Sequence, residues 1–241
     1  MVGLVTDIGL KRQLNEDSAL YFEDDDLRIY VVADGMGGHN AGEVASVMAV
    51  NEVIRYVKEN FTANCNEDLL IESINLANKH VYDFAKTNKN LSGMGTTITA
   101  CFMTKEFIQI ANVGDSSCFG IKFNEEIIDK ITKDHSLVQE LVDIGSITEE
   151  EARNHPKKNI ITRALGTDSK VDVDIFPIRK GIYDVLLLCS DGLTNEISKS
   201  EMLHILISDN DLETKAKLLV ERAKMNGGKD NITVLLFGGE M

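Results

Sequence analysis

The chain has no apolar run close to the roughly 20 residues that a membrane-spanning helix requires. Its first residues, MVGLVTD, also lack the basic start and the apolar stretch of a secretory leader. Cysteine is scarce, and the four cysteines have neither the spacing of a zinc site nor that of a redox pair. We therefore expect a cytoplasmic protein with buried, reduced thiols and with neither zinc nor disulfides.

Positive charge is also scarce, because 25 Lys and Arg stand against 39 Asp and Glu, which gives a net charge of -14. Such a surface repels the phosphate backbone of nucleic acids, so we expect no DNA or RNA partner. An anionic substrate remains possible where divalent cations neutralise clustered carboxylates. No linker, repeat or low-complexity tract interrupts the chain, and we expect residues 1–241 to form a single domain.

Hydrophobic periodicity predicts a mixture of helices and antiparallel strands. Apolar residues recur at helical intervals over 41–61 and 67–88. Short apolar runs such as 98–103 and 107–113 are so close in sequence that they pair as hairpins. Further strands are expected at 3–8, 18–22, 27–33, 118–123, 127–131, 171–178, 183–189 and 232–237, with further helices at 202–207 and 212–225 and capping boxes at Thr148 and Ser198.

Several aspartates share one local context at the ends of the predicted strands. Asp34 and Asp191 each end an apolar run and precede a glycine, whereas Asp17 and Asp230 stand just before a strand. Asp115 lies between Gly114 and Ser116. Stacked sheets place strand ends side by side, so these carboxylates can converge at one edge. The alternative is that they are unrelated helix caps and turn formers.

A cluster of carboxylates requires positive charge, because like charges about 4 Å apart repel by several kcal/mol in a partly buried setting. Oxygen ligands without cysteine or histidine select a hard cation such as Mg²⁺ or Mn²⁺. Two such ions about 3.5–4 Å apart can share a water and lower its pKa. Hydrolysis of a phosphate ester is the chemistry that this arrangement favours.

Seven short motifs of this chain, in the order in which they occur, resemble those of the compact bacterial branch of the protein phosphatase 2C (PPM) family. They are Thr6-Asp7-x-Gly9-x-x-Arg12-x-x-Asn15-Glu16-Asp17, Val32-Ala33-Asp34-Gly35-Met36-Gly37-Gly38-His39, Gly93-Met94-Gly95-Thr96-Thr97, Asn112-Val113-Gly114-Asp115-Ser116, Asp134-His135-Ser136, Ser190-Asp191-Gly192-Leu193 and Gly228-Lys229-Asp230-Asn231-Ile232-Thr233. The resemblance implies an α+β fold, a four-layer αββα sandwich of two antiparallel sheets flanked by helix pairs. It also implies a metal-dependent phosphoserine/phosphothreonine protein phosphatase in which a metal-bridging water or hydroxide attacks phosphorus directly.

The same resemblance implies roles for individual residues. Asp34 and the backbone carbonyl of Gly35 match groups that bridge or flank two core Mn²⁺ or Mg²⁺ ions. Asp17 and Asp191 match ligands of the same core, direct or through water, and Asp230 matches a further ligand of that core. Asp115 matches the carboxylate that helps to bind a third, weaker ion in bacterial members. Arg12 matches the arginine that binds the substrate phosphate, and its planar fork suits two phosphate oxygens.

Other positions admit two interpretations. His39 either donates a proton to the leaving group or has a structural role. Ser117 follows Gly114-Asp115-Ser116, where many relatives have Arg, so a contact of that arginine is either missing or supplied otherwise. The family carries a flap at about 145–165, and the basic stretch 153–158 within it either receives phosphoprotein substrates or is a solvated loop.

The expected partners are phosphorylated proteins, including targets of a bacterial-type Ser/Thr kinase and that kinase itself, and we expect a monomer. One rival is a pseudophosphatase that binds phosphoproteins without turnover. Its signature would be a lost metal carboxylate, and none is lost here. A sporulation-type regulator is a third reading, but such chains usually carry sensory or membrane segments.

Overall fold

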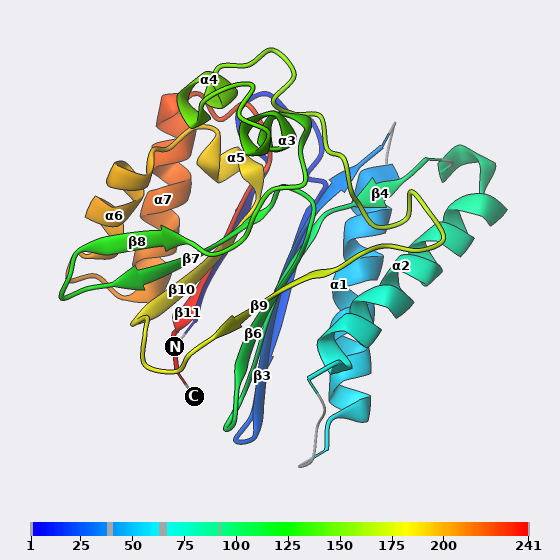
Figure 1. Cartoon of the computed structure of the whole chain (residues 1–241), viewed down its shortest axis with the longest axis horizontal. Helices are drawn as coiled ribbons and strands as arrows, with labels where there is room; N and C mark the ends of the chain where they lie inside the picture. The colour runs from blue at the N-terminus through cyan, green and yellow to red at the C-terminus, as the bar shows by residue number, and fades with distance from the viewer. Residues whose placement is uncertain (1, 38–40, 63–66, 92, 241) are drawn as a thin grey trace.

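A computed structural model describes residues 2–37, 41–62, 67–91 and 93–240. The strands form two antiparallel sheets (Figure 1). Sheet A has the order β1-β11-β10-β7-β8, with β1 Val2–Asp7, β7 Ser117–Lys122, β8 Ile127–Lys130, β10 Val185–Cys189 and β11 Ile232–Gly238. Sheet B has the order β2-β3-β5-β6-β9, with β2 Asp17–Glu23, β3 Leu27–Met36, β5 Ile98–Thr104, β6 Ile108–Val113 and β9 Asp174–Ile178, and the short β4 Gly95–Thr96 also pairs with β3.

Helices cover the outer face of each sheet, which confirms the four-layer αββα arrangement (Figure 1). The pair α1 Ala41–Asn60 and α2 Leu69–Thr87 packs on sheet B, and α2 is followed by the 3-10 turn η1 Lys89–Leu91. Sheet A is covered by α5 Asp191–Thr194, α6 Lys199–Leu206 and α7 Leu212–Asn226. The short α3 Leu137–Asp143 and α4 Glu149–Arg153 lie beyond one end of the sheets (Figure 1).

Strand β3 shows why this fold needs continuous apolar runs. Side chains alternate across a strand, so Ile29 and Val31 contact the α1–α2 layer while Tyr30 and Val32 enter the core between the sheets. The rings of Tyr30 and Phe237 stack there with centroids 3.6 Å apart. A strand buried on both faces is held rigidly, and β3 therefore fixes the position of the residues at its end.

The predicted elements are largely confirmed, with differences at their ends. The helices expected at 41–61 and 67–88 are α1 and α2. Strand β3 runs past the predicted end at Ala33 as far as Met36, because β4 supplies backbone partners for Gly35 and Met36. Strand β9 is shorter than predicted because its pairing with β6 begins only at Asp174.

The capping boxes predicted at Thr148 and Ser198 are confirmed, each with its side chain bonded to the backbone of a glutamate three residues on. Cys101, Cys118 and Cys189 are buried thiols, while Cys65 lies outside the described residues. Among the described residues, no helix is long and apolar enough to cross a membrane.

Candidate functional site

Asp17 and Asp34 lie directly opposite each other on the paired strands β2 and β3. Asp17 is only 8% exposed, and its Oδ2 accepts hydrogen bonds from the hydroxyls of Ser190 and Thr233, both at 2.7 Å. Its Oδ1 is buried, and none of the described residues forms a hydrogen bond with it. Ser190 directly follows β10 and Thr233 lies in β11, and both strands belong to sheet A. The strand ends of the two sheets therefore meet at this carboxylate.

Asp191 follows β10 and Asp230 precedes β11. Because these two strands are paired, the two aspartates lie at the same end of sheet A. The amide of Asn195 donates to Asp191 Oδ2 at 2.8 Å and so fixes that side chain. Gly192 allows the start of α5 to approach β11, since a Cβ there would lie 1.9 Å from the carbonyl oxygen of Asn231. A glycine at this point therefore brings Asp191 close to Asp230.

Asp115 stands just after β6 and is 8% exposed, and its buried Oδ1 has no hydrogen-bond partner within the described ranges. The turn that carries it is held by His135. The ring Nδ1 of His135 accepts a hydrogen bond from the Gly114 N–H at 3.0 Å, and the backbone N–H of His135 donates to the Gly114 carbonyl at 2.9 Å. Gly114 has φ +108, a region that favours glycine. The conformation of Gly114 therefore aims Asp115 toward the other carboxylates.

Glu16 also belongs to this cluster, although the motif that contains it gave it no role in the sequence analysis. Its Oε1 is buried and has no hydrogen-bond partner in the described part of the chain, and burial raises the pKa of its carboxyl. Its backbone joins the two sheets, because its carbonyl accepts from the Gly35 N–H at 3.0 Å and its N–H donates to Asn231 Oδ1 at 2.9 Å. Its position directly before Asp17 was the signal that could have identified it.

The carboxylates destabilise one another's charged forms. Burial, followed by repulsion from neighbouring aspartates, raises the pKa of Asp17 to about 7 and that of Asp191 to about 6. Burial also raises the pKa of Asp34 well above its ordinary value, and the charges of Asp17, Asp191, Asp115 and Asp230 add to that effect. The pKa of Asp115 is raised well above its usual range in the same way, with burial first and Asp191 next.

The chemistry of this cluster fits a hard divalent cation. Its donors are oxygens, and three buried ones have no hydrogen-bond partner among the residues that the structure describes, namely Glu16 Oε1, Asp17 Oδ1 and Asp115 Oδ1. Within the described ranges, no three His, Cys, Asp or Glu side chains are arranged to hold one ion by themselves. Oxygen donors of this kind are the ligands that Mg²⁺ and Mn²⁺ prefer.

Arg12 lies at the rim of the cluster, with its Nη2 2.8 Å from Asp230 Oδ2 and its side chain 48% exposed. It is within electrostatic reach of Glu16 and Asp34, and the hydrogen bond to Asp230 raises the pKa of its guanidinium. The fork can therefore reach an anion that enters from solvent. His39 lies outside the described residues.

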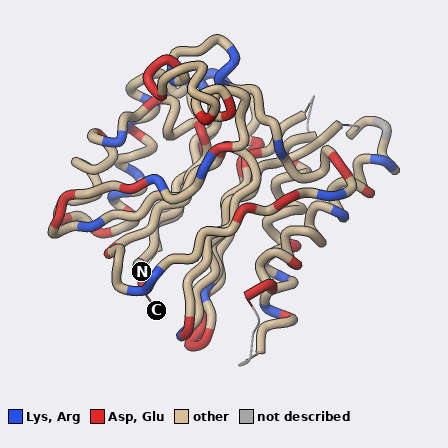
Figure 2. The backbone as a smooth tube through the Cα atoms, viewed as in Figure 1, with Lys and Arg blue, Asp and Glu red and all other residues tan. Residues whose placement is uncertain are grey.

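The basic stretch of the predicted flap lies beside these carboxylates. Lys158 Nζ donates to Asn195 Oδ1 at 2.8 Å, and Asn195 in turn holds Asp191. A groove of about 800 Å³ is lined by Arg153, Lys158, Asp115 and Asp191, among others. Charged residues are concentrated on the helices, loops and strand ends of the molecule (Figure 2).

The structure brings together most of the residues that the sequence analysis selected. Asp17, Asp34, Asp115, Asp191 and Asp230 lie within mutual electrostatic reach, and the Gly35 backbone is packed against Glu16. Ser117 is buried, and its Oγ has no hydrogen-bond partner among the described residues.

Known proteins resemble this chain over almost its full length. Residues 10–224 match the family profile described as Protein phosphatase 2C. The chain is 46% identical over 235 residues to the Serine/threonine phosphatase stp of Listeria innocua, covering 96% of this chain and 92% of that protein. It is 38% identical over 238 residues to Protein phosphatase PhpP of Streptococcus pneumoniae, covering 98% and 96% of the two chains. The crystal structure of Serine/threonine phosphatase Stp1 from Staphylococcus aureus superposes with a TM-score of 0.92 at 39% identity, covering 98% of this chain and 94% of that one.

Proposed function

Since this chain belongs to the protein phosphatase 2C family and is a serine/threonine protein phosphatase, we propose how its carboxylate cluster performs the hydrolysis. Its substrates are phosphorylated proteins, and its family generally uses divalent metal ions. In our proposal water attacks the phosphorus of phosphoserine or phosphothreonine directly, so no phosphoenzyme forms.

The proposed ligands of two core Mn²⁺ or Mg²⁺ ions are the carboxylates of the cluster and one backbone carbonyl. They are Asp17, Asp34, Asp191, Asp230, the carbonyl of Gly35 and, from its buried unpartnered oxygen, Glu16. When bound, such a pair of ions lowers the pKa of a shared water and supplies a nucleophile at neutral pH. Asp115 is the proposed ligand of a third, more weakly bound ion.

The side chains around the cluster bind and orient the phosphate. Arg12 presents a half-exposed guanidinium that can donate two parallel hydrogen bonds to phosphoryl oxygens while staying close to Asp230. Asn195 holds the Asp191 carboxylate in one orientation. His39, five positions after Asp34 in the sequence, is the proposed proton donor to the leaving serine or threonine oxygen.

The observation that supports this proposal best is the convergence of buried carboxylates, with Asp17 directly opposite Asp34, because a folded protein tolerates such a cluster at neutral pH when cations are bound. The test is release of inorganic phosphate from a phosphothreonine peptide. We expect dependence on Mn²⁺ or Mg²⁺, loss on chelation, and a decrease in kcat/KM of about a thousandfold or more for Asp34→Asn and for Asp191→Asn. Undiminished turnover in both variants would refute the assignment.

We further propose that the substrates include targets of a bacterial-type Ser/Thr kinase and the kinase itself, and that the chain acts as a cytoplasmic monomer. The position of Lys158 beside Asn195 supports a flap that contacts the protein around the phosphorylated residue. Light scattering of the purified chain measures the oligomeric state. Dephosphorylation of the purified kinase, compared with that of a phosphopeptide, measures the preference for that substrate.

A further inference from the structure

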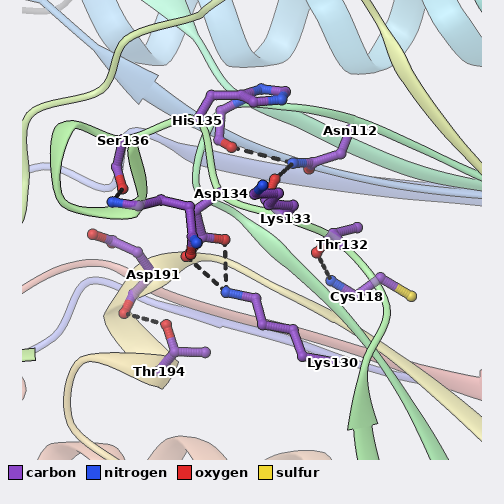
Figure 3. Close-up of polar contacts among 12 residues, drawn as sticks. Asn112, Cys118, Lys130, Thr132, Lys133, Asp134, His135, Ser136, Asp191 and Thr194 are labelled. Carbon is purple, nitrogen blue, oxygen red and sulfur yellow. Dashed lines mark hydrogen bonds and ion pairs between the residues drawn. The ribbon is translucent and has the colours of Figure 1, made fainter. Parts of the chain in front are cut away.

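Lys130, the last residue of β8, carries a cation into the groove beside the candidate site. Its Nζ donates to both carboxylate oxygens of Asp134, at 2.6 and 2.7 Å. The two side chains are mostly buried, with 25% and 24% of their surfaces exposed. An ion pair in this setting is screened by water less than one on an open surface. Figure 3 shows Lys130 reaching Asp134, with Asp191 nearby.

The segment that carries this ion pair lies along the turn that bears Asp115. Ile131 N–H donates to the Cys118 carbonyl at 2.8 Å, and His135 N–H donates to the Gly114 carbonyl at 2.9 Å. Lys130, Asp134, Asp115 and Asp191 all line the same groove. The ion pair therefore stands next to the proposed ligand of the weak third ion.

The charges around Asp115 oppose one another. The negative charges of Asp191 and Asp134 disfavour ionisation of the buried Asp115 carboxyl, whereas the positive charge of Lys130 favours it. The neighbouring Lys133 is directed elsewhere, because its Nζ pairs with Asp143 at 2.7 Å and its side chain is 52% exposed. Lys130 is thus a lysine whose charge favours the ionised form of Asp115.

We propose that Lys130 is a fixed internal cation that neutralises Asp134 and thereby keeps the Asp115 end of the groove a weak binding site for a divalent ion. The inference rests on the proposed function, which assigns Asp115 to such an ion. In this arrangement the affinity of the outer ion is set by a protein ion pair that touches neither the substrate nor the core ligands.

The inference fixes an order of affinities. Lys130→Met leaves Asp134 as an additional unpaired anion, so the outer site should bind Mn²⁺ about five- to thirtyfold more tightly. Asp134→Asn leaves Lys130 unpaired, so binding should weaken by a similar factor. The double variant removes both charges and should return to the affinity of the wild type, as should Lys130→Arg, which keeps the charge.

The experiment is a titration of the metal-free full chain with Mn²⁺. Binding is measured by calorimetry and by the electron paramagnetic resonance signal of the free ion. Asp115→Asn identifies the outer class of sites as the one it abolishes. Lys133→Met is the matched control, because it removes the same charge one position before Asp134 and should change the outer affinity by no more than about twofold. Lys130→Gln replaces Lys130→Met if the latter does not fold.

Unchanged outer binding in Lys130→Met or Lys130→Gln would overturn the inference, and so would an equal effect of Lys133→Met. A double variant that binds as tightly as Lys130→Met would also overturn it. Wild-type chain that shows no Mn²⁺ binding sensitive to Asp34→Asn contradicts the proposed function as well. Core binding that stays intact, without any Asp115-dependent class in any variant, overturns this inference and the assignment of Asp115 to a third ion, and it leaves the proposed two-ion core intact.

Discussion

In our proposal Arg12 binds the substrate phosphate, because it is a half-exposed cation at the rim of a buried acidic cluster. Lysine at this position would keep the charge and lose the planar fork. We predict that Arg12→Lys lowers kcat/KM for a phosphothreonine peptide by about ten- to a hundredfold, since one of two charge-assisted hydrogen bonds is lost. Steady-state kinetics at saturating Mn²⁺ measure it.

Arg28→Lys is the matched control for that variant, because Arg28 lies by the β2–β3 turn and interacts with Glu23 and Glu240. It should leave kcat/KM unchanged. Equal kinetics for Arg12→Lys and the wild type would mean that Arg12 does not hold the phosphate through its fork.

Asp17 makes the stability of the metal-free protein depend on pH. Burial raises the pKa of Asp17 from 3.8 to about 7, so between these values the folded state binds more protons than the unfolded state. The free energy of unfolding should therefore fall as pH rises from about 4 to 7. Asp191, whose pKa is raised to about 6, acts in the same direction.

We predict that Asp17→Asn reduces this fall by about 1–3 kcal/mol in the chelated protein, as measured by urea unfolding at a series of pH values. Excess Mn²⁺ should reverse the trend in the wild type, because bound cations favour the ionised carboxylates. An identical pH dependence for Asp17→Asn and the wild type would contradict the raised pKa.

At the scale of single residues, some members of the candidate site could be predicted from the sequence and others could not. The five aspartates were selected because each stands beside a strand end or a glycine, and the structure brings them together. Glu16 was missed because its side chain reaches the cluster only through the packing of its backbone against Gly35. The pairing of Lys130 with Asp134 could not be predicted, since it depends on the course of the chain between β8 and α3.

At the scale of elements, β3 approaches α1 closely at Gly35, and adding a single methyl group at this position tests that contact. A Cβ on Gly35 would lie 2.1 Å from the Gly42 carbonyl oxygen and 2.6 Å from that of Glu16. Gly35→Ala must therefore shift the end of β3. We predict a loss of stability of about 2–4 kcal/mol in denaturant unfolding, together with weaker Mn²⁺ binding.

Gly93→Ala serves as the control for that variant. A Cβ there would meet nothing within 4 Å, although φ is +79, so the cost should be limited to about 1 kcal/mol of backbone strain. Equal unfolding free energies for the two variants would show that the contact between β3 and α1 is looser than described.

Elements with strong local signals were predicted well, and those defined by tertiary contacts were not. The helices α1 and α2 follow from apolar periodicity, and both capping boxes follow from four-residue patterns. The four-residue α5 was missed because it is too short to show a period. Strand β3 extends to Met36 only because β4 pairs with it from a distant part of the chain.

At the scale of the whole molecule, sheet pairing creates the site. Strand β11 lies between β1 and β10. Residues near the two ends of the sequence therefore meet the residues that follow β10 at one end of the sheet. Local patterns predict the strands but not their order, and the four-layer arrangement was expected only through the resemblance to protein phosphatase 2C. The carboxylates of the candidate site are thus brought together by the sheet topology, and each comes from a separate strand end.

The central claim is that these carboxylates hold divalent cations where the phosphate is hydrolysed. The most direct test is a crystal structure of the chain grown with Mn²⁺ and measured for anomalous scattering. The account predicts two strong anomalous peaks beside Asp34 and the Gly35 carbonyl, within reach of Asp191 and Asp230. Density without any peak near Asp34 at saturating Mn²⁺ would contradict it.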